Sequence, residues 1–362
     1  MRRVYGAVLA WVLGSAFMHA QSTTPFKLGT FDREGRTFVG IVLRESVVID
    51  FVAAHQAIRP ASTLAAPADM KDLIVRYESG LRARIFDVVR NVEAAGGAKL
   101  AYVYDRTAVR VLPPIMYPTT MLNVAVNYAA HDQEMAQLRA QVPGMGAATS
   151  GAALPGTQSA PGIWERASGD TRWNPYMFMK SPAAIIGDGD TIRLPPGRTQ
   201  VDWECELGVV VARQATRVPV ATSADYIFGY TLQNDVSDRG GRGDTRYGSD
   251  WLISKNHDTF APLGPFITPK EFIADPQKLT VRFVLNGQVM QEASTSLMIH
   301  NVFEQISYAS NIMTLRPGDV IATGTPAGVG SARTPPVYFK PGDRSVCTYE
   351  GVGTLTNSVA GS

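Results

Sequence analysis

The sequence predicts a strand-rich α+β fold, and three observations support this prediction. Of the 362 residues, 33 are glycine and 23 are proline, so turns are frequent. Apolar and alternating runs of strand length recur along the chain, whereas residues 81–94 and 302–311 place apolar residues at helical spacing. Asn286-Gly287 lies between two strand-like runs and is the strongest short-range signal of a β-hairpin.

The composition is that of an ordinary globular protein with a core. Hydrophobic residues make up 45% of the chain and charged residues 18%. The net charge is only +2, and no tract of Lys and Arg marks a surface for nucleic acid. We therefore expect a small-molecule partner and no nucleic acid, in a chain long enough for one large or two modest domains.

Residues 1–20 have the order of a secretory signal peptide. Arg2 and Arg3 precede an apolar run over residues 4–17, and Ala20-Gln21 follows. The run is shorter than the roughly 20 residues that span a membrane. We expect a periplasmic or secreted protein with no membrane attachment after cleavage; the alternative is an uncleaved membrane anchor.

Two further boundaries follow from composition. Residues 25–114 read as a small N-terminal α/β domain that ends at Pro113-Pro114, and residues 115–362 read as a strand-rich domain. Residues 137–174 are rich in Ala, Gly, Ser, Pro and Thr, with few large apolar side chains to order them. We expect this segment to be a flexible insertion, either disordered or acting as a lid.

The two cysteines, Cys205 and Cys347, each lie in an apolar, strand-like stretch. An oxidising compartment would permit a disulfide between them. Sequence alone does not say whether their Cα atoms come close enough. The surroundings favour two free, buried thiols, and no cysteine spacing is typical of a zinc site.

Glu204 and Glu206 are the first candidates for chemistry. In a strand, alternate residues point to the same side, so the two carboxylates would face one place. They would repel each other unless a cation or protons lay between them. Oxygen ligands suit Mg²⁺, Mn²⁺ or Ca²⁺ better than zinc. The alternative is an acidic strand edge that faces solvent.

Other candidates lie in separate segments. If the segment around His131 is helical, His131 and Glu134 share a face and could act as a general base and its partner. Arg239 could bind a substrate carboxylate in bidentate fashion. Lys255 could neutralise an enolate near a metal, and His257 is the rival base. The alternative for each is a solvated surface charge.

Several motifs occur in a fixed order along the chain. They are Glu204-x-Glu206, Gly229-Tyr230, Asn234-Asp235-x-Ser237-x-Arg239, Ser254-Lys255, Pro262-Leu263-Gly264-Pro265 and the run from Pro317 to Pro326. In this order they resemble the fumarylacetoacetate hydrolase family. The resemblance extends from about residue 118 to residue 359, and the preceding segment resembles the family's small N-terminal domain.

The resemblance implies a mixed β-roll, usually a homodimer, with a divalent cation as cofactor. By this likeness the metal ligands are Glu204, Glu206 and Asp235, and the cation is Mg²⁺, or else Mn²⁺ or Ca²⁺. The remaining implied site residues are the catalytic His131, Glu134 and Lys255 and the substrate-binding Tyr128, Arg239 and Thr325.

The implied reaction is cleavage of a C–C bond in a small acylpyruvate or 1,3-dioxo acid. A decarboxylase, a hydratase or an isomerase needs the same stabilisation of an enolate. The alternatives are therefore an oxaloacetate decarboxylase, a hydratase or an enol–keto isomerase on the same scaffold. A third reading, an exported oxo-acid-binding protein without catalysis, leaves a base such as His131 without a purpose.

Overall fold

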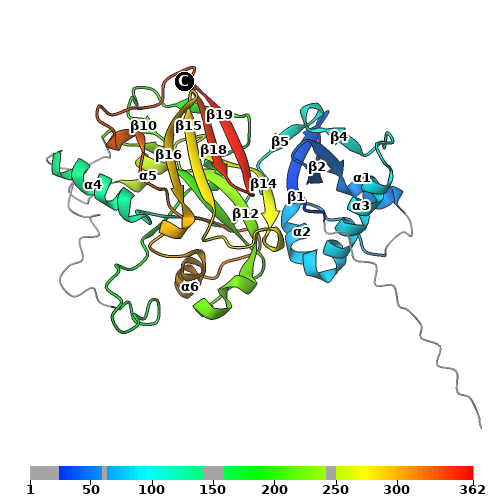
Figure 1. The fold of residues 1–362 in the computed structure, drawn as a ribbon, viewed down its shortest axis with the longest axis horizontal. Coiled ribbons are helices and arrows are strands. Elements are labelled where there is room, and N and C mark those ends of the chain that lie inside the picture. The colour runs from blue at the N-terminus through cyan, green and yellow to red at the C-terminus, as the bar shows by residue number, and fades with distance from the viewer. Residues whose placement is uncertain (1–23, 59–62, 142–158, 242–249, 362) are drawn as a thin grey trace, which may run out of the picture.

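The computed structural model describes residues 24–58, 63–141, 159–241 and 250–361 (Figure 1). Strands dominate, and helices lie at the periphery of the two lobes. The α-helices are α1 (Phe51–Ala57), α2 (Met70–Arg76), α3 (Arg82–Ala94), α4 (Ala129–Gln141), α5 (Trp251–Lys255) and α6 (Val302–Ile312).

The largest sheet has twelve strands, ten of which follow the order β4-β3-β2-β1-β14-β12-β11-β17-β6-β7; β5 pairs with β1 and β8 with β14. Its order does not close on itself, so within the described residues it is an open sheet rather than a barrel. Its strands are β1 (Lys27–Arg33), β2 (Arg36–Leu43), β3 (Val47–Asp50), β4 (Val103–Asp105), β5 (Arg110–Leu112), β6 (Met121–Val124), β7 (Met177–Met179), β8 (Ile185–Ile186), β11 (Cys205–Val211), β12 (Ile227–Asn234), β14 (Ala261–Pro269) and β17 (Val320–Ala322).

A second sheet has five strands in the order β16-β15-β18-β19-β9, and β10 and β13 form a separate pair. These open, mixed sheets with peripheral helices confirm the predicted strand-rich α+β fold. The bounds are β9 (Thr191–Leu194), β15 (Thr280–Leu285), β16 (Gln288–Ser294), β18 (Arg344–Tyr349), β19 (Gly353–Gly361), β10 (Val201–Asp202) and β13 (Ser237–Asp238).

The N-terminal unit forms one end of the molecule (Figure 1). It contains β1 to β5 and α1 to α3, and its sheet is continuous with the larger unit because β1 pairs with β14, with Leu28 opposite Ile267. Phe26 and Leu28 share a buried cluster with Leu263 and Ile267. The two units therefore meet through a common sheet and a common core.

The two large sheets pack face to face through β11 and β15. Cys205 and Leu207 of β11 lie in one buried cluster with Val281 and Phe283 of β15. The rings of Trp203 and Phe283 stack with centroids 5.2 Å apart. Alternate residues of a strand face opposite sides, so Glu206 points away from this core.

Local sequence signals explain several elements. Asn286 and Gly287 both have positive φ, 50° and 86°, as a tight hairpin turn between β15 and β16 requires. At α6, the Asn301 side chain accepts from the backbone of Glu304, whose carboxylate accepts from the Asn301 backbone. The predicted hairpin and the predicted helices over residues 81–94 and 302–311 are confirmed.

The two cysteines form a disulfide, so the expectation of free thiols was wrong. Cys205 lies in β11 of the large sheet and Cys347 in β18 of the five-stranded sheet. Face-to-face packing of the sheets brings their Cα atoms to 5.5 Å, within the range that a disulfide spans. Both cysteines lie in the buried hydrophobic core. The residues around each cysteine in the sequence are therefore apolar, and such surroundings are also typical of a free, buried thiol.

Residues 159–174, part of the segment in which we expected a flexible insertion, pack against α6. Trp164 is buried, and its ring meets His300 edge to face with centroids 5.5 Å apart. The guanidinium of Arg172 donates to both carboxylate oxygens of Glu304, at 3.1 and 2.9 Å, and also binds Asp170. Residues 142–158 lie outside the described part of the chain.

Acid should release this packed segment from α6. Hydrogen bonds from Arg172 lower the pKa of Asp170 to about 2. Burial opposes ionisation of Glu304, but His300, whose Nδ1 lies 3.7 Å from Oε2 of Glu304, and hydrogen bonds from Arg172 lower the pKa of Glu304 to about 2. Unfolded carboxyls titrate near pH 4, so this stabilisation is present above about pH 4 and is lost as the pH falls toward 2. We expect pepsin to cleave the chain within residues 159–174 only between about pH 4 and pH 2. In Arg172→Gln the same cleavage should begin at a higher pH. Equal cutting of both chains at every pH would contradict this account.

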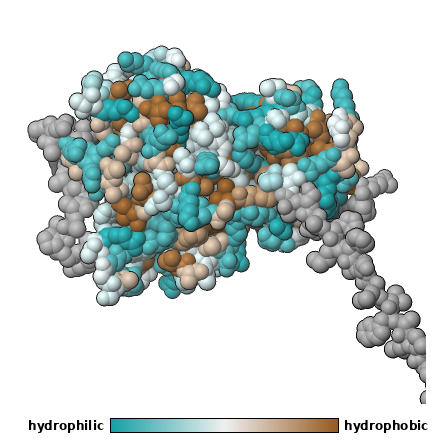
Figure 2. All heavy atoms as spheres, viewed as in Figure 1, coloured by the Kyte–Doolittle hydropathy of each residue, from teal (hydrophilic) through white to brown (hydrophobic). Residues whose placement is uncertain are grey.

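The hydropathy of the face viewed in Figure 2 is mixed, with small hydrophobic areas separated by hydrophilic ones. Within the described ranges, no helix combines the length and apolar character that crossing a bilayer requires.

Candidate metal centre

Three buried carboxylates converge on the face of the large sheet that lies away from the five-stranded sheet. One oxygen each from Glu204, Glu206 and Asp235 lies within 4.8 Å of the others, and we call this group the carboxylate cluster. All three side chains are buried, with Glu204 the most accessible at 6% exposed. The predicted convergence of Glu204 and Glu206 is therefore present, and Asp235 joins them.

The backbone around Glu204 explains why these residues meet. The strand that we expected to carry Glu204 and Glu206 is interrupted at Trp203 and Glu204, between β10 and β11. There the backbone N–H of Glu204 donates to the side chain of Asn234 at 3.0 Å, and the N–H of Asp235 donates to the carbonyl of Glu204 at 2.8 Å. These two bonds fix the end of β12 beside the start of β11.

Two lysines form ion pairs with the carboxylate cluster. Lys255, the last residue of α5, places its Nζ 2.9 Å from Glu204 and 2.7 Å from Asp235. Lys180, which follows β7, is fully buried and contacts Asp235 and the carbonyl of Val236. Sequence reasoning missed Lys180; its one signal was a lysine directly after the apolar strand residues 177–179.

Arg239 supplies a third cation, held by two carboxylates. Its Nε donates to Asp202 at 2.7 Å, and its Nη2 donates to Glu204 at 2.5 Å. Asp202 in turn accepts from the backbone of Ser331 at 2.8 Å. The predicted role of Arg239 in binding a substrate carboxylate stays a prediction, since its described contacts are to protein carboxylates.

The charges of the carboxylate cluster and of the residues that pair with it do not cancel. Four carboxylates, those of Asp202, Glu204, Glu206 and Asp235, face three cations, Lys180, Lys255 and Arg239.

Glu206 is the carboxylate left over. Its described hydrogen bond is from the backbone of Gly324 at 3.0 Å, and no cationic side chain among the described residues forms an ion pair with it. Burial and the charges of Asp235 and Glu204 hold the pKa of Glu206 well above its usual range. Burial also opposes ionisation of Glu204, but the charges of Lys255 and Arg239 outweigh it and lower that pKa.

This imbalance fits a divalent cation. Hard cations such as Mg²⁺ and Mn²⁺ prefer carboxylate oxygens, and the cluster offers three of these within 4.8 Å of one another. A cation there would also remove the repulsion that opposes ionisation of Glu206. Glu204, Glu206 and Asp235 are the residues that would hold it.

His131 and Glu134 lie on one face of α4, as predicted. Nδ1 of His131 is 3.3 Å from Oε2 of Glu134, and the His131 side chain is 5% exposed. Both oxygens of Glu134 accept from the backbone N–H of Gly328, at 2.8 and 3.1 Å, which fixes the carboxylate. A positive charge on His131 would lower the pKa of Glu204, after the larger effects of Lys255 and Arg239.

The other predicted residues differ in how they contact the site. Tyr128 is buried near the cluster, and burial raises its pKa, so its hydroxyl keeps the proton. The Thr325 hydroxyl donates to the carbonyl of Cys205 at 3.2 Å and accepts from Gln291 at 2.8 Å, and its substrate role stays a prediction. His257, the rival base, lies 3.4 Å from Asp238 and contacts none of the three proposed ligands among its described ion pairs.

Removing Lys180 should destabilise the metal-free chain. Lys180→Met leaves part of the negative charge of Asp235 unpaired in the protein interior, which costs about 3–5 kcal/mol. A bound cation would replace the lost charge. We therefore expect a large fall in Tm with chelator present and a smaller one with Mn²⁺. The same fall in both conditions would contradict the placement of Lys180 beside the cluster.

Comparisons with known proteins agree with this geometry. Residues 120–360 match the family described as fumarylacetoacetate (FAA) hydrolase, C-terminal. A mitochondrial oxaloacetate tautomerase from Rattus norvegicus is 35% identical over 254 residues, 70% of each chain.

Solved structures extend the likeness to almost the whole chain. A 5-carboxymethyl-2-hydroxymuconate delta-isomerase from Mycobacterium smegmatis has a TM-score of 0.62 and 29% identity, covering 93% of this chain and 99% of that one. A maleylpyruvate hydrolase from Sphingobium sp. SYK-6, in complex with manganese(II) and pyruvate, has a TM-score of 0.65 and 27% identity, covering 92% and 99%. That structure supports a divalent metal in proteins with this fold.

Proposed function

The chain belongs to the fumarylacetoacetate hydrolase family, and we propose that it is a divalent-metal-dependent enzyme that acts on a small 2-oxo acid through an enolate. One observation carries this proposal: the segment 324–328 contacts both Glu206 of the buried carboxylate cluster, which no described cation pairs with, and Glu134 of the His131–Glu134 pair. A binding protein would have no use for such a base.

Each residue near the cluster has a chemical part in this proposal. His131 takes a proton from the carbon between two carbonyl groups, or from water, and returns it; Glu134 holds the imidazole ring and stabilises its charged form. Lys255 and Lys180 offset the negative charge that an enolate brings into the site. The cation, when bound, supplies Lewis acidity toward the oxygens of the 2-oxo acid.

Enol–keto tautomerisation of an oxaloacetate-like acid is the reaction that we place first. It needs only a base and stabilisation of the enolate, both of which the described residues supply. The relative that carries the tautomerase name shares 35% identity with this chain, more than the 27% of the maleylpyruvate hydrolase.

Cleavage of a C–C bond in an acylpyruvate, the reaction expected from the sequence, is the second candidate. It uses the same enolate and the same base, and the maleylpyruvate hydrolase structure with manganese and pyruvate supports it.

Product analysis separates the two reactions. Oxaloacetate and acetylpyruvate are each incubated with the purified chain and Mn²⁺, with a chelator as control, while the enol absorbance is followed and masses are recorded. A tautomerase speeds equilibration of oxaloacetate without changing its mass. A hydrolase releases acetate and pyruvate from acetylpyruvate, and a decarboxylase releases pyruvate from oxaloacetate. Metal binding without any of these reactions would favour the binding-protein reading.

We also propose that the protein is exported and acts in the periplasm or outside the cell. The signal-like residues 1–20 and the Cys205–Cys347 disulfide support this location, because disulfides persist in oxidising compartments. N-terminal sequencing of protein from the native host should give a start near Gln21, whereas a start at Met1 would contradict cleavage.

We propose a homodimer as the assembly. Light scattering on the purified chain tests it directly, since the full chain has a mass of 39.1 kDa and a dimer would give about twice that value. A mass equal to one chain would contradict the dimer.

A further inference from the structure

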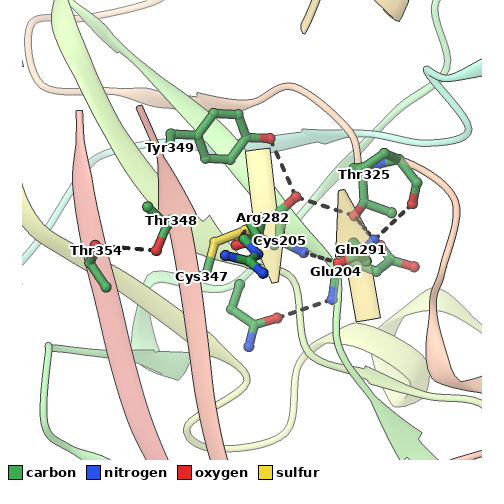
Figure 3. Close-up of a disulfide and its surroundings, with 11 residues drawn as sticks. Glu204, Cys205, Arg282, Gln291, Thr325, Cys347, Thr348, Tyr349 and Thr354 are labelled. Atoms are coloured by element: carbon green, nitrogen blue, oxygen red, sulfur yellow. Dashed lines mark hydrogen bonds between the residues drawn. A yellow bond between two sulfur atoms is a disulfide. The ribbon is translucent and has the colours of Figure 1, made fainter. Parts of the chain in front are cut away.

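Cys205 lies between two residues of the carboxylate cluster and points away from it. Glu204 and Glu206 direct their carboxylates toward Asp235. The Cys205 side chain enters the core between the two sheets and bonds to Cys347 of β18 (Figure 3). Because the three residues are consecutive, a displacement of the Cys205 backbone moves both neighbouring carboxylates.

The backbone of Cys205 is also held by side chains from other elements (Figure 3). Its N–H donates to Gln291 of β16 at 3.2 Å. Its carbonyl accepts from Thr325 at 3.2 Å and from the hydroxyl of Tyr349 at 3.4 Å. Tyr349 lies two residues after Cys347 on β18, so β18 holds this position of β11 by one covalent bond and one hydrogen bond.

The disulfide is enclosed by the fold. Cys205 is 0% exposed and Cys347 is 1% exposed. A reductant in solution reaches these sulfurs only when the sheets separate, so the bond is a constant feature of the folded chain. It joins residues 142 positions apart and links the sheet that carries the metal ligands to the sheet that packs behind it.

We propose that the Cys205–Cys347 disulfide is a positioning element of the metal centre. It fixes the part of β11 that carries Glu204 and Glu206, so the affinity for the cation depends on the covalent bond. This inference rests on the proposed function, because it requires the carboxylate cluster to bind a divalent cation. A disulfide that only stabilised the packing of the sheets would leave the metal affinity unchanged.

The first measurement establishes the bond. Alkylation of the denatured, unreduced chain should leave its mass unchanged, and two alkylated thiols would overturn the inference. The second is a Mn²⁺ titration of Cys205→Ala, Cys347→Ala and the double variant. We expect each to weaken the Kd by about tenfold or more, as loss of a supporting contact does, and the double variant to be no worse than either single one. Cys347→Ala is decisive because it alters no atom of the ligand segment.

Two further variants separate affinity from stability. Ile192→Ala removes buried volume from the same core in β9, which is separated from β18 by β19, and should lower Tm while leaving the Mn²⁺ Kd unchanged. The variant Cys205→Ala with Cys347→Val keeps more of the core volume and serves if the alanine variants fail to fold. An unchanged Kd for Mn²⁺ in the folded cysteine variants would overturn the role of the disulfide but not the metal centre. A wild-type chain that binds no Mn²⁺ would overturn the metal centre itself, and this inference with it.

Discussion

Glu206→Gln should abolish metal binding and turnover while leaving the metal-free chain at least as stable as the wild type. The physical reason is the position of Glu206 in the charge balance: burial, Asp235 and Glu204 all oppose its ionisation, and no described cation pairs with it. The amide has the same shape, can still accept from Gly324, and carries no charge to repel its neighbours. We expect Mn²⁺ affinity to fall by more than about a hundredfold. Loss of a residue that only supports a metal ligand costs up to about a hundredfold in affinity, and loss of a ligand should cost more.

The matched control for this variant is Glu204→Gln. Glu204 forms ion pairs with Lys255 and Arg239, so its loss should reduce both metal affinity and the Tm of the metal-free chain. Titration with Mn²⁺ and thermal melts in chelator give both quantities for both variants. If Glu206→Gln bound Mn²⁺ with wild-type affinity, Glu206 would not be a ligand.

His131→Asn should remove turnover and leave metal affinity unchanged. His131 is oriented by Glu134 and its charge would lower the pKa of Glu204, but it is not one of the three oxygen ligands. Loss of a positioned general base lowers kcat by about 10²- to 10⁴-fold. Steady-state kinetics and Mn²⁺ titration on the same preparation measure the two effects separately.

His257→Asn is the control for the identity of the base. His257 pairs with Asp238 rather than with the cluster, so its replacement should leave kcat close to the wild-type value. Retained activity in His131→Asn, together with loss of activity in His257→Asn, would assign the base to His257 and refute the role of α4.

The predictions that succeeded depended on short-range patterns. The β15–β16 hairpin follows from Asn286-Gly287, and α6 begins at Asn301 because its capping residues are adjacent in sequence. The convergence of Glu204 and Glu206 was predicted from the alternation of side chains along a strand. The two carboxylates still meet although the strand is interrupted before β11.

The features that sequence reasoning missed depend on long-range packing. Lys180 binds Asp235 from 55 positions away, and Cys205 bonds to Cys347 from 142 positions away. Contacts between residues so far apart in the sequence produce no periodic pattern from which they could be predicted. The pairing of β1 with β14, which joins the N-terminal unit to the main sheet, is equally remote and could not be read from either strand alone.

The metal centre is tested most directly by anomalous scattering from crystals of the chain soaked in Mn²⁺. The account predicts one peak between Glu204, Glu206 and Asp235, about 2.0–2.3 Å from an oxygen of each. If Mn²⁺ has free access in the crystal and the anomalous peak lies only at other residues, or no peak is found, Glu204, Glu206 and Asp235 do not form the metal centre.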